Sequence, residues 1–497
     1  MKKSPDKLVV LALFTLLPVT AAIQHPALAT EAIIIGGGSD VLDSNNHFED
    51  SILWIENVLT ERDVSYRTYF NDGSKESPDT YYQTDELTRP LTSVFGNVAG
   101  TQRRFRNHGL GNIHGSTMVG DLEPALTKGL AENTDEELLL IHSGLGSFSG
   151  TGEDSASLKL WNDDRLSTSR LHQLLAQNER TVRYVFSHSY SGSFHRLAYR
   201  NPSQGLELNG TTHCGFTSNS AYSESEFSSE FSDASDYRDY LSYFFSALSG
   251  FEYDGQIISR FADLDEDGQT SLREAHLFTL EEAMSIDLPL SSSEDYLLRW
   301  QPWYLRWQPP QKQLPNNEYS QIFRHLAKRM DITVNDNVAR GIRKEMATVT
   351  NRLQAIEQQR REQEASIKGL QSTIQSALIS QWPTLAQPYT QDFEKLLKSD
   401  NFPAIETLIE QFQPEYEQLQ SMQKDAQHVS RQHLGKRREA VQLQKLLRLR
   451  HLALIKQQLY EYGSEQQISD YRTLLLCEEA PLMPTTSTTV ISEKTIQ

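Results

Sequence analysis

Two apolar stretches that each end in a run of serine and glycine most constrain the fold of this chain. The first is Leu138–Gly146, with the sequence LLLIHSGLG, and the second is Arg183–Phe194, with the sequence RYVFSHSYSGSF. Apolar runs of this kind are typical of strands that are buried on both faces, as in a parallel sheet. The carboxyl ends of parallel strands open into the crevice where α/β proteins hold their sites. We therefore expect both stretches to end side by side at one site.

Strand-like and helix-like patterns alternate around these two stretches. Strands are expected at Glu31–Gly38, Val64–Phe70 and Thr211–Thr217, and helices at Phe48–Glu61 and Leu166–Gln177, where leucine and isoleucine recur at helical spacing. Strands that alternate with helices indicate an α/β domain with a mainly parallel sheet that is flanked by helices. We place this domain at residues 30–300.

The length of 497 residues indicates more than one domain. We expect Asn71–Asp121 to be loop-like, residues 301–335 to form a connector rich in tryptophan and proline, and residues 471–497 to form a disordered tail. Residues 336–470 have a heptad pattern and are expected to form an all-α coiled-coil module. An antiparallel helical hairpin is the simplest arrangement, and the alternative is self-association or partner binding through helices 340–380 and 415–462.

The first 29 residues have the pattern of an export signal, which predicts a periplasmic or secreted protein. Lys2 and Lys3 precede the apolar run Leu8–Val19, and Ala27-Leu28-Ala29 supplies a cleavage site. The alternative is an uncleaved anchor, although the run is short for a membrane span. No other stretch is long and apolar enough, so we expect no membrane span after signal removal. A net charge of −19 argues against nucleic acid as a partner and would suit a cation.

The two cysteines are far apart in the sequence. Cys214 lies in an expected strand of the α/β domain and Cys477 lies in the expected tail. We therefore expect no disulfide framework, and we expect Cys214 to be buried and unreactive.

The two strand ends resemble those of caspase-like cysteine peptidases of the legumain and metacaspase type. In metacaspase-like members the first strand ends Ser-Gly-His-Gly, with histidine as the base, and the second ends Asp-Ala-Cys-x-Ser-Gly, with cysteine as the nucleophile. Here Ser143-Gly144-Leu145-Gly146 places Leu145 at the histidine position, and Ser187–Gly192 places Ser189 at the cysteine position. Their separation in sequence is close to the roughly 50 residues of caspases. The resemblance implies a caspase-like fold over the α/β domain.

Replacement of both members of the dyad predicts an inactive pseudopeptidase with a regulatory or interaction role. A serine hydroxyl needs an adjacent base, and Leu145 cannot be that base. The alternative is an active hydrolase in which Ser189 is the nucleophile and His142 is a displaced base. His188 precedes Ser189 in the strand and is expected to point to the opposite face. A third option is a pocket that only binds a ligand, through backbone amides around Gly144, Gly146 and Gly192.

The sharpest motif of the chain is the twelve-residue segment Asp263–Glu274, with the sequence DLDEDGQTSLRE. It fits the EF-hand loop, in which carboxylates at positions one, three and five and a bidentate glutamate at position twelve hold calcium around a glycine at position six. Helices are expected on both sides, at Gln256–Ala262 and Arg273–Ala283. Position eight is Thr270, where an aliphatic residue usually pairs with a second loop. The predicted Ca²⁺ ligands are Asp263, Asp265, Asp267, Gln269, Ser271 and Glu274.

Overall fold

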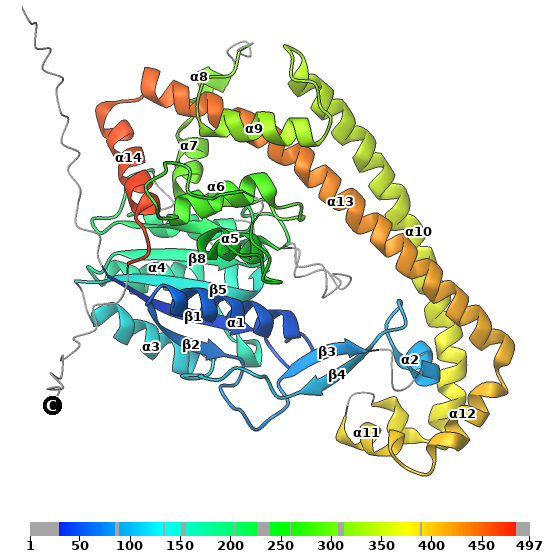
Figure 1. The fold of residues 1–497 in the computed structure, drawn as a ribbon. Coiled ribbons are helices and arrows are strands. Elements are labelled where there is room, and N and C mark those ends of the chain that lie inside the picture. The colour runs from blue at the N-terminus through cyan, green and yellow to red at the C-terminus, as the bar shows by residue number, and fades with distance from the viewer. Residues whose placement is uncertain are drawn as a thin grey trace, which may run out of the picture.

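A mainly parallel sheet forms the centre of the α/β domain in the computed structural model (Figure 1). Residues 29–84, 89–132, 135–150, 156–201, 205–225, 239–258, 260–306, 313–387 and 390–483 are described. The strands of the sheet are β1 (Thr30–Gly37), β2 (Ser65–Phe70), β5 (Glu137–Phe148), β8 (Val182–Ser187), β9 (His213–Thr217) and β10 (Leu290–Ser291). They lie in the order β10-β9-β8-β5-β1-β2, and β10 alone of these six runs antiparallel to its neighbour.

Helices cover both faces of this sheet, as the alternating sequence pattern predicts. One face packs on α1 (Asn46–Glu61), α5 (Tyr240–Ser249) and α6 (Leu272–Glu282). The other packs on α3 (Val119–Ala131) and α4 (Thr168–Ala176). The central strands are buried on both sides, which explains their continuous apolar runs. A mixed α/β class with a mainly parallel sheet is therefore confirmed.

The segment that was expected to be loop-like contains a small folded unit. It holds β3 (Thr80–Thr84), α2 (Arg89–Phe95) and β4 (Gln102–Arg106), and β3 pairs antiparallel with β4. The prediction for Asn71–Asp121 is wrong here because α2 is too short for a helical period to stand out. Its apolar residues Leu91 and Val94 are buried against the far end of the C-terminal helices.

The C-terminal region forms the expected helical hairpin. The long helices α10 (Val338–Gln381) and α13 (Gln413–Tyr462) lie side by side (Figure 1). Ile342, early in α10, shares an apolar cluster with Leu446, late in α13, so the two helices are antiparallel. The turn between them contains η5 (Pro383–Ala386), α11 (Gln391–Leu397) and α12 (Phe402–Glu410). The expected connector contains α8 (Trp303–Arg306) and α9 (Glu318–Arg329), after α7 (Ser292–Trp300).

Two apolar clusters fasten the hairpin to the α/β domain, one at each end. The proximal cluster, which contains Ile342 and Leu446, joins α10 and α13 to α7, α9 and β9. The distal cluster, which contains Leu91 and Val94, joins them to α2. Glutamines strengthen the distal contact, because Gln375 and Gln423 donate to the carbonyls of Val94 and Ser93. Between the clusters the hairpin is polar, with Arg360 bonded to Glu357 at 2.8 Å.

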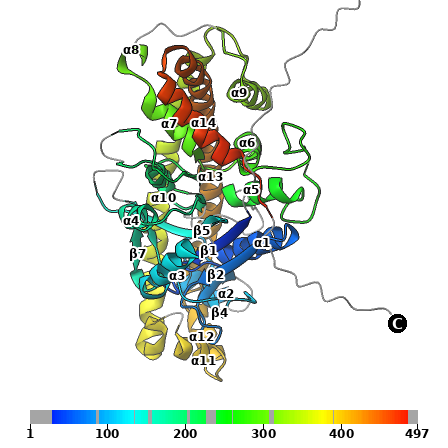
Figure 2. The same ribbon diagram turned by 90° about the vertical axis from the view of Figure 1, so that its left-hand side faces the viewer.

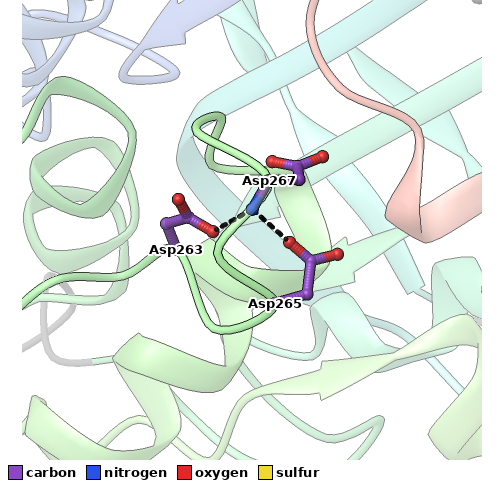
Figure 3. A group of neighbouring side chains, drawn as sticks. All are labelled: Asp263, Asp265 and Asp267. Atoms are coloured by element: carbon purple, nitrogen blue, oxygen red, sulfur yellow. Dashed lines mark hydrogen bonds between the residues drawn. The ribbon is translucent and has the colours of Figure 1, made fainter.

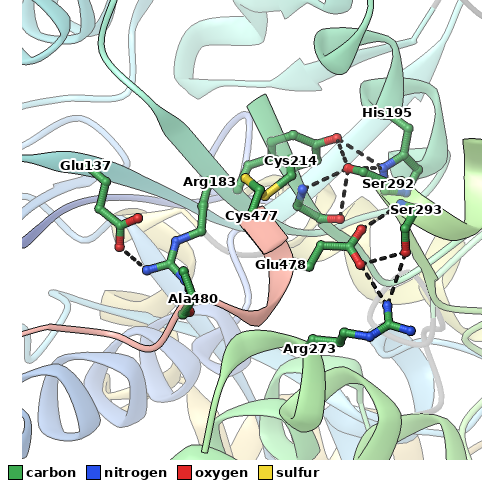
Figure 4. Close-up of a disulfide and its surroundings, with 12 residues drawn as sticks. Glu137, Arg183, His195, Cys214, Arg273, Ser292, Ser293, Cys477, Glu478 and Ala480 are labelled. Carbon is green, nitrogen blue, oxygen red and sulfur yellow. Dashed lines mark hydrogen bonds and ion pairs between the residues drawn. A yellow bond between two sulfur atoms is a disulfide. The ribbon is translucent and has the colours of Figure 1, made fainter. Parts of the chain in front are cut away.

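The end of the chain returns to the sheet, in contrast to the expected tail. Helix α14 (Glu465–Glu479) packs on α6, α7 and β9 (Figure 2). Cys477 of α14 forms a disulfide with Cys214 of β9 (Figure 4), so the prediction of unpaired cysteines is also wrong. Met483 bonds to Thr30 of β1, so residues 471–483 are ordered against the sheet. The helical period of α14 is weak because Leu474, Leu475 and Leu476 are consecutive, Leu476 is exposed and the polar Glu478 is buried.

The expected signal peptide, apart from Ala29, and residues 484–497 of the expected tail lie outside the described residues. Within the described part of the chain, no helix combines the length and the apolar character needed to cross a membrane.

Candidate functional site

The structure brings together the two strand ends that carry the Ser-Gly motifs at residues 143–146 and 187–192. Strands β5 and β8 are parallel, and Ser143 is the register partner of Ser187. Beyond that point β5 leaves the main sheet and pairs with β6 (Ala156–Lys159), which continues through η2 (Trp161–Asp163) to β7 (Arg165–Ser167). A Cβ atom on Gly146 would lie 2.1 Å from the carbonyl oxygen of Ser189. Only glycine permits this close approach of the two motifs.

His142 and His188 lie on the face of the sheet that packs on α3 and α4. The rings of His142 and His188 are in edge contact, with centroids 4.9 Å apart, and both pack on Phe186. Leu145 packs on the opposite apolar cluster, with α1 and α5. His142 and Leu145 therefore lie on opposite faces of the sheet.

The hydroxyl of Ser189 has a backbone partner instead. Its Oγ accepts a hydrogen bond from the N–H of Ser225 at 3.0 Å, and the N–H of Tyr190 donates to the carbonyl of Ser223 at 2.8 Å. Ser189 is 7% exposed. Among the described residues, no hydrogen bond joins its Oγ to a histidine. The segment that contains Ser223 and Ser225 thus lies against Ser189 and Tyr190.

Burial makes both histidines poor bases. It lowers the pKa of His188 to about 4, and it holds the pKa of His142 well below its usual value, with a further contribution from His188. Nδ1 of His142 and Nε2 of His188 are buried without hydrogen-bond partners. A general base works best when its pKa is near the operating pH. These two imidazoles are therefore neutral core groups at pH 7.

The space beside Gly192 is also filled. A Cβ atom there would lie 2.6 Å from the nitrogen of Ala221 and 2.7 Å from the carbonyl oxygen of Asn219. The chain turns at Tyr190, which has a φ of 67°, into the 3₁₀ helix η3 (Ser191–Ala198). The backbone on this side of the motif packs on the neighbouring loop, which disfavours a ligand there.

The segment Asp263–Glu274, called the acidic loop below, brings three of the predicted calcium ligands together (Figure 3). Asp263, Asp265 and Asp267 each place a carboxylate oxygen within 4.8 Å of the others. Asp263 accepts from the N–H groups of Asp267 at 3.2 Å and Gly268 at 2.9 Å, which fixes the turn. Gly268 has a φ of 89°, a backbone conformation that favours glycine. The donor set fits a hard cation such as Ca²⁺.

The other predicted calcium ligands, Gln269, Ser271 and Glu274, are not part of this group of carboxylates. Oε2 of Glu274 accepts from the N–H and hydroxyl of Ser271 in a capping box at the start of α6. Oε1 of Glu274 accepts from the N–H groups of Leu264 at 2.7 Å and Asp265 at 3.2 Å, so its carboxylate lies against the loop. Gln269 is exposed.

The helix after the loop is present as α6, but the described residues of the segment Gln256–Ala262 form no helix. In its place Ile257 forms a β-bridge with Phe251, and the N–H of Ile258 bonds to the carbonyl of Gly250. Ile257 and Phe261 are 74% and 87% exposed. These two large apolar residues thus bury no helical face, and helix formation there would gain little packing energy from them.

A buried ionic cluster beside the loop was missed by the sequence analysis (Figure 4). Arg273 donates to Glu478 at 2.9 Å and to Glu318 at 2.8 Å, and Ser293 donates to Glu478 at 2.7 Å. Burial raises the pKa of Glu478 to about 7. These four residues come from α6, α7, α9 and α14, and no local signal in the sequence joins them. They link the helix that follows the acidic loop to the C-terminal helix.

Comparison with known proteins gives little guidance. No family model matches the chain, and no curated protein matches it. Among solved structures, Raptor from Chaetomium thermophilum matches with a TM-score of 0.28 and 10% sequence identity, over 66% of this chain and 32% of that one. The match thus spans about a third of Raptor. A likeness at this level supports no statement about function.

Proposed function

We propose that this chain is an exported calcium-binding protein whose caspase-like domain is catalytically inactive and has a regulatory or interaction role. The observation that carries the calcium proposal is the set of three aspartate oxygens within 4.8 Å of one another in the acidic loop. The ligand positions of this loop and the glycine at position six also match the EF-hand spacing.

Calcium would bind by completing a loop whose turn is already formed. Asp263 bonds to the backbone of the turn at positions five and six, so little ordering is needed on binding. The Glu274 carboxylate would exchange its bonds to Leu264 and Asp265 for the ion. A single loop without a partner loop fits weak extracellular sites, with a Kd on the order of 10⁻⁴–10⁻³ M.

Calcium at ten times its Kd is expected to stabilise the protein by about 1.4 kcal/mol, measured as a rise in Tm by calorimetry. The double variant Asp265→Asn/Asp267→Asn should lose this rise, because two carboxylate ligands become neutral. Both side chains are exposed, so the fold should be unaffected. Glu266→Gln is the matched control, since position four makes the same type of charge change without removing a ligand. An unchanged Tm of the wild type at 10 mM calcium, or an equal rise in the double variant, contradicts the proposal.

The inactive peptidase reading is supported by the surroundings of Ser189. Its hydroxyl accepts from a backbone amide, and the nearby imidazoles are buried and neutral. Leu145 supplies neither a base nor a polar group. A serine without an activating base is a poor nucleophile at neutral pH.

Purified mature protein is expected to cleave no member of a broad peptide library, measured by mass spectrometry of the products. Ser189→Ala tests the alternative of a serine hydrolase, and Ser193→Ala is the control because its buried hydroxyl has no hydrogen-bond partner. Cleavage that is lost in Ser189→Ala and kept in Ser193→Ala would establish the hydrolase instead.

Export is supported by two independent features. Residues 1–29 have the pattern of a signal peptide. The Cys214–Cys477 disulfide fits an oxidising compartment such as the periplasm or the extracellular space.

The seam of the hairpin is buried within this chain at Ile342, Val349 and Ile374, so we place partner binding on the outward faces of the two helices.

A further inference from the structure

A cavity of about 430 Å³ lies where the helical hairpin meets the α/β domain. Leu288, in the loop before β10, contributes one wall. Arg343 of α10 and the α13 residues Arg448, Arg450 and His451 contribute others. The volume is in the range of sites for small molecules, which is about 300–1,000 Å³.

The lining of this cavity has the opposite charge to the protein as a whole. Three guanidinium groups and one imidazole line it, and none of the described lining residues is acidic. The chain has a net charge of −19. Burial and the neighbouring charge of Arg343 lower the pKa of Arg450, which indicates that these two cations repel each other. A concave site of one charge sign concentrates ions of the other sign.

Arg448 is held in place before any ligand arrives. Its guanidinium donates to the carbonyl oxygens of Leu288, at 3.1 Å, and Pro289. Its Nε is buried without a hydrogen-bond partner. The carboxylate of Glu294 contributes a favourable charge but is hydrogen-bonded to His276 at 3.2 Å. The donor group of Arg448 is therefore fixed by the fold, with one N–H unsatisfied.

We propose that this cavity binds a small organic phosphate. The planar guanidinium donates two parallel hydrogen bonds to phosphate oxygens, and several such groups around one cavity suit a dianion better than a single carboxylate. The cavity is larger than one phosphate group, and Leu288 and Leu447 supply apolar surface for the organic part. The ligand would bridge α10, α13 and the loop that leads into β10.

Titration calorimetry of the full chain at low ionic strength tests this site, with phenyl phosphate as the probe. Phenyl phosphate should bind the wild type at least tenfold more tightly than benzoate, which has the same ring and a single negative charge. The double variant Arg343→Gln/Arg450→Gln should lose at least tenfold in affinity for phenyl phosphate. Arg448 is left intact because its bonds to Leu288 and Pro289 support the fold.

The matched control is Arg352→Gln/Arg431→Gln, which removes two exposed charges from the same two helices outside the cavity. Its affinity for phenyl phosphate should equal that of the wild type. Equal losses in the two double variants would show a general charge effect and overturn the site. Absence of binding to the wild type at 10 mM phenyl phosphate, or equal binding of benzoate, would also overturn it.

Discussion

Cys477→Ser is expected to lower the free energy of unfolding by about 4–5 kcal/mol, because it removes a cross-link between residues 263 positions apart. The cross-link restricts the unfolded chain, and the entropy that it removes grows slowly with the size of the closed loop. Urea unfolding of oxidised wild type and of the variant measures the difference. The loss is large relative to the 5–15 kcal/mol of a typical domain.

Two comparisons separate the cross-link from the cost of the substitution itself. The double variant Cys214→Ser/Cys477→Ser should have the stability of wild type under reducing conditions to within about 1 kcal/mol. A reductant should leave the stability of the double variant unchanged. If wild type has the same stability before and after reduction, with two free thiols found by titration, the disulfide does not stabilise the fold.

Acidification from pH 6.5 to 4 is expected to destabilise the protein strongly. Burial lowers the pKa of His188 and His213 to about 4 and that of His195 to about 3. Unfolding exposes these rings, which then take up protons near pH 6.5, so their contribution is full above pH 6.5 and is lost as the pH falls to the folded values. Each histidine contributes on the order of 3 kcal/mol at neutral pH. The raised pKa values of Asp239 and Glu478 act in the opposite direction and offset part of the slope.

Urea unfolding between pH 7 and pH 4.5 measures this slope. His188→Gln should reduce it by about 1.4 kcal/mol per pH unit below pH 6, since one proton fewer is bound on unfolding. His428→Gln, at an exposed position of α13, is the control and should leave the slope unchanged. A slope that is identical in wild type and His188→Gln would show that this ring is protonated in the folded state.

The parallel strands of the sheet could be predicted because each of them has its own local signal. The strands β1, β5 and β8 are apolar runs that end in glycine or serine, and α1 has a clear helical period. The hairpin helices α10 and α13 could be expected for the same reason, since they are long and their pattern repeats. In all of these elements the residues that decide the structure are close together in the sequence.

The disulfide and the small folded unit of β3, α2 and β4 depend on contacts between distant segments. Cys477 could be paired with Cys214 only by knowing that α14 returns to β9, and the few buried residues of α14 gave no such signal. Helix α2 is stable because the far end of the hairpin covers Leu91 and Val94. The missing helix before the acidic loop has the same explanation, since Ile257 and Phe261 are largely exposed and gain little from packing.

The arrangement around the two candidate catalytic positions, Leu145 and Ser189, could be predicted in part. The close approach of the two motifs follows from two adjacent parallel strands, and it is present at Gly146 and Ser189. The face of the sheet on which His142 lies could be predicted from the alternation of side chains along β5. Residues 142 and 145 differ by an odd number, so their side chains point to opposite faces. The same alternation places His188 and Ser189 on opposite faces.

The attachment of the hairpin at both ends limits how it can move. Rotation of α10 and α13 as one body would open the proximal cluster or the distal contacts of Gln375 and Gln423 with α2. The polar middle around Glu357 and Arg360 buries much less apolar surface. Bending at this middle opens neither cluster and is therefore the deformation of lowest cost. A partner that gripped the outer faces of the hairpin would change its curvature and leave both anchor points on the α/β domain in place.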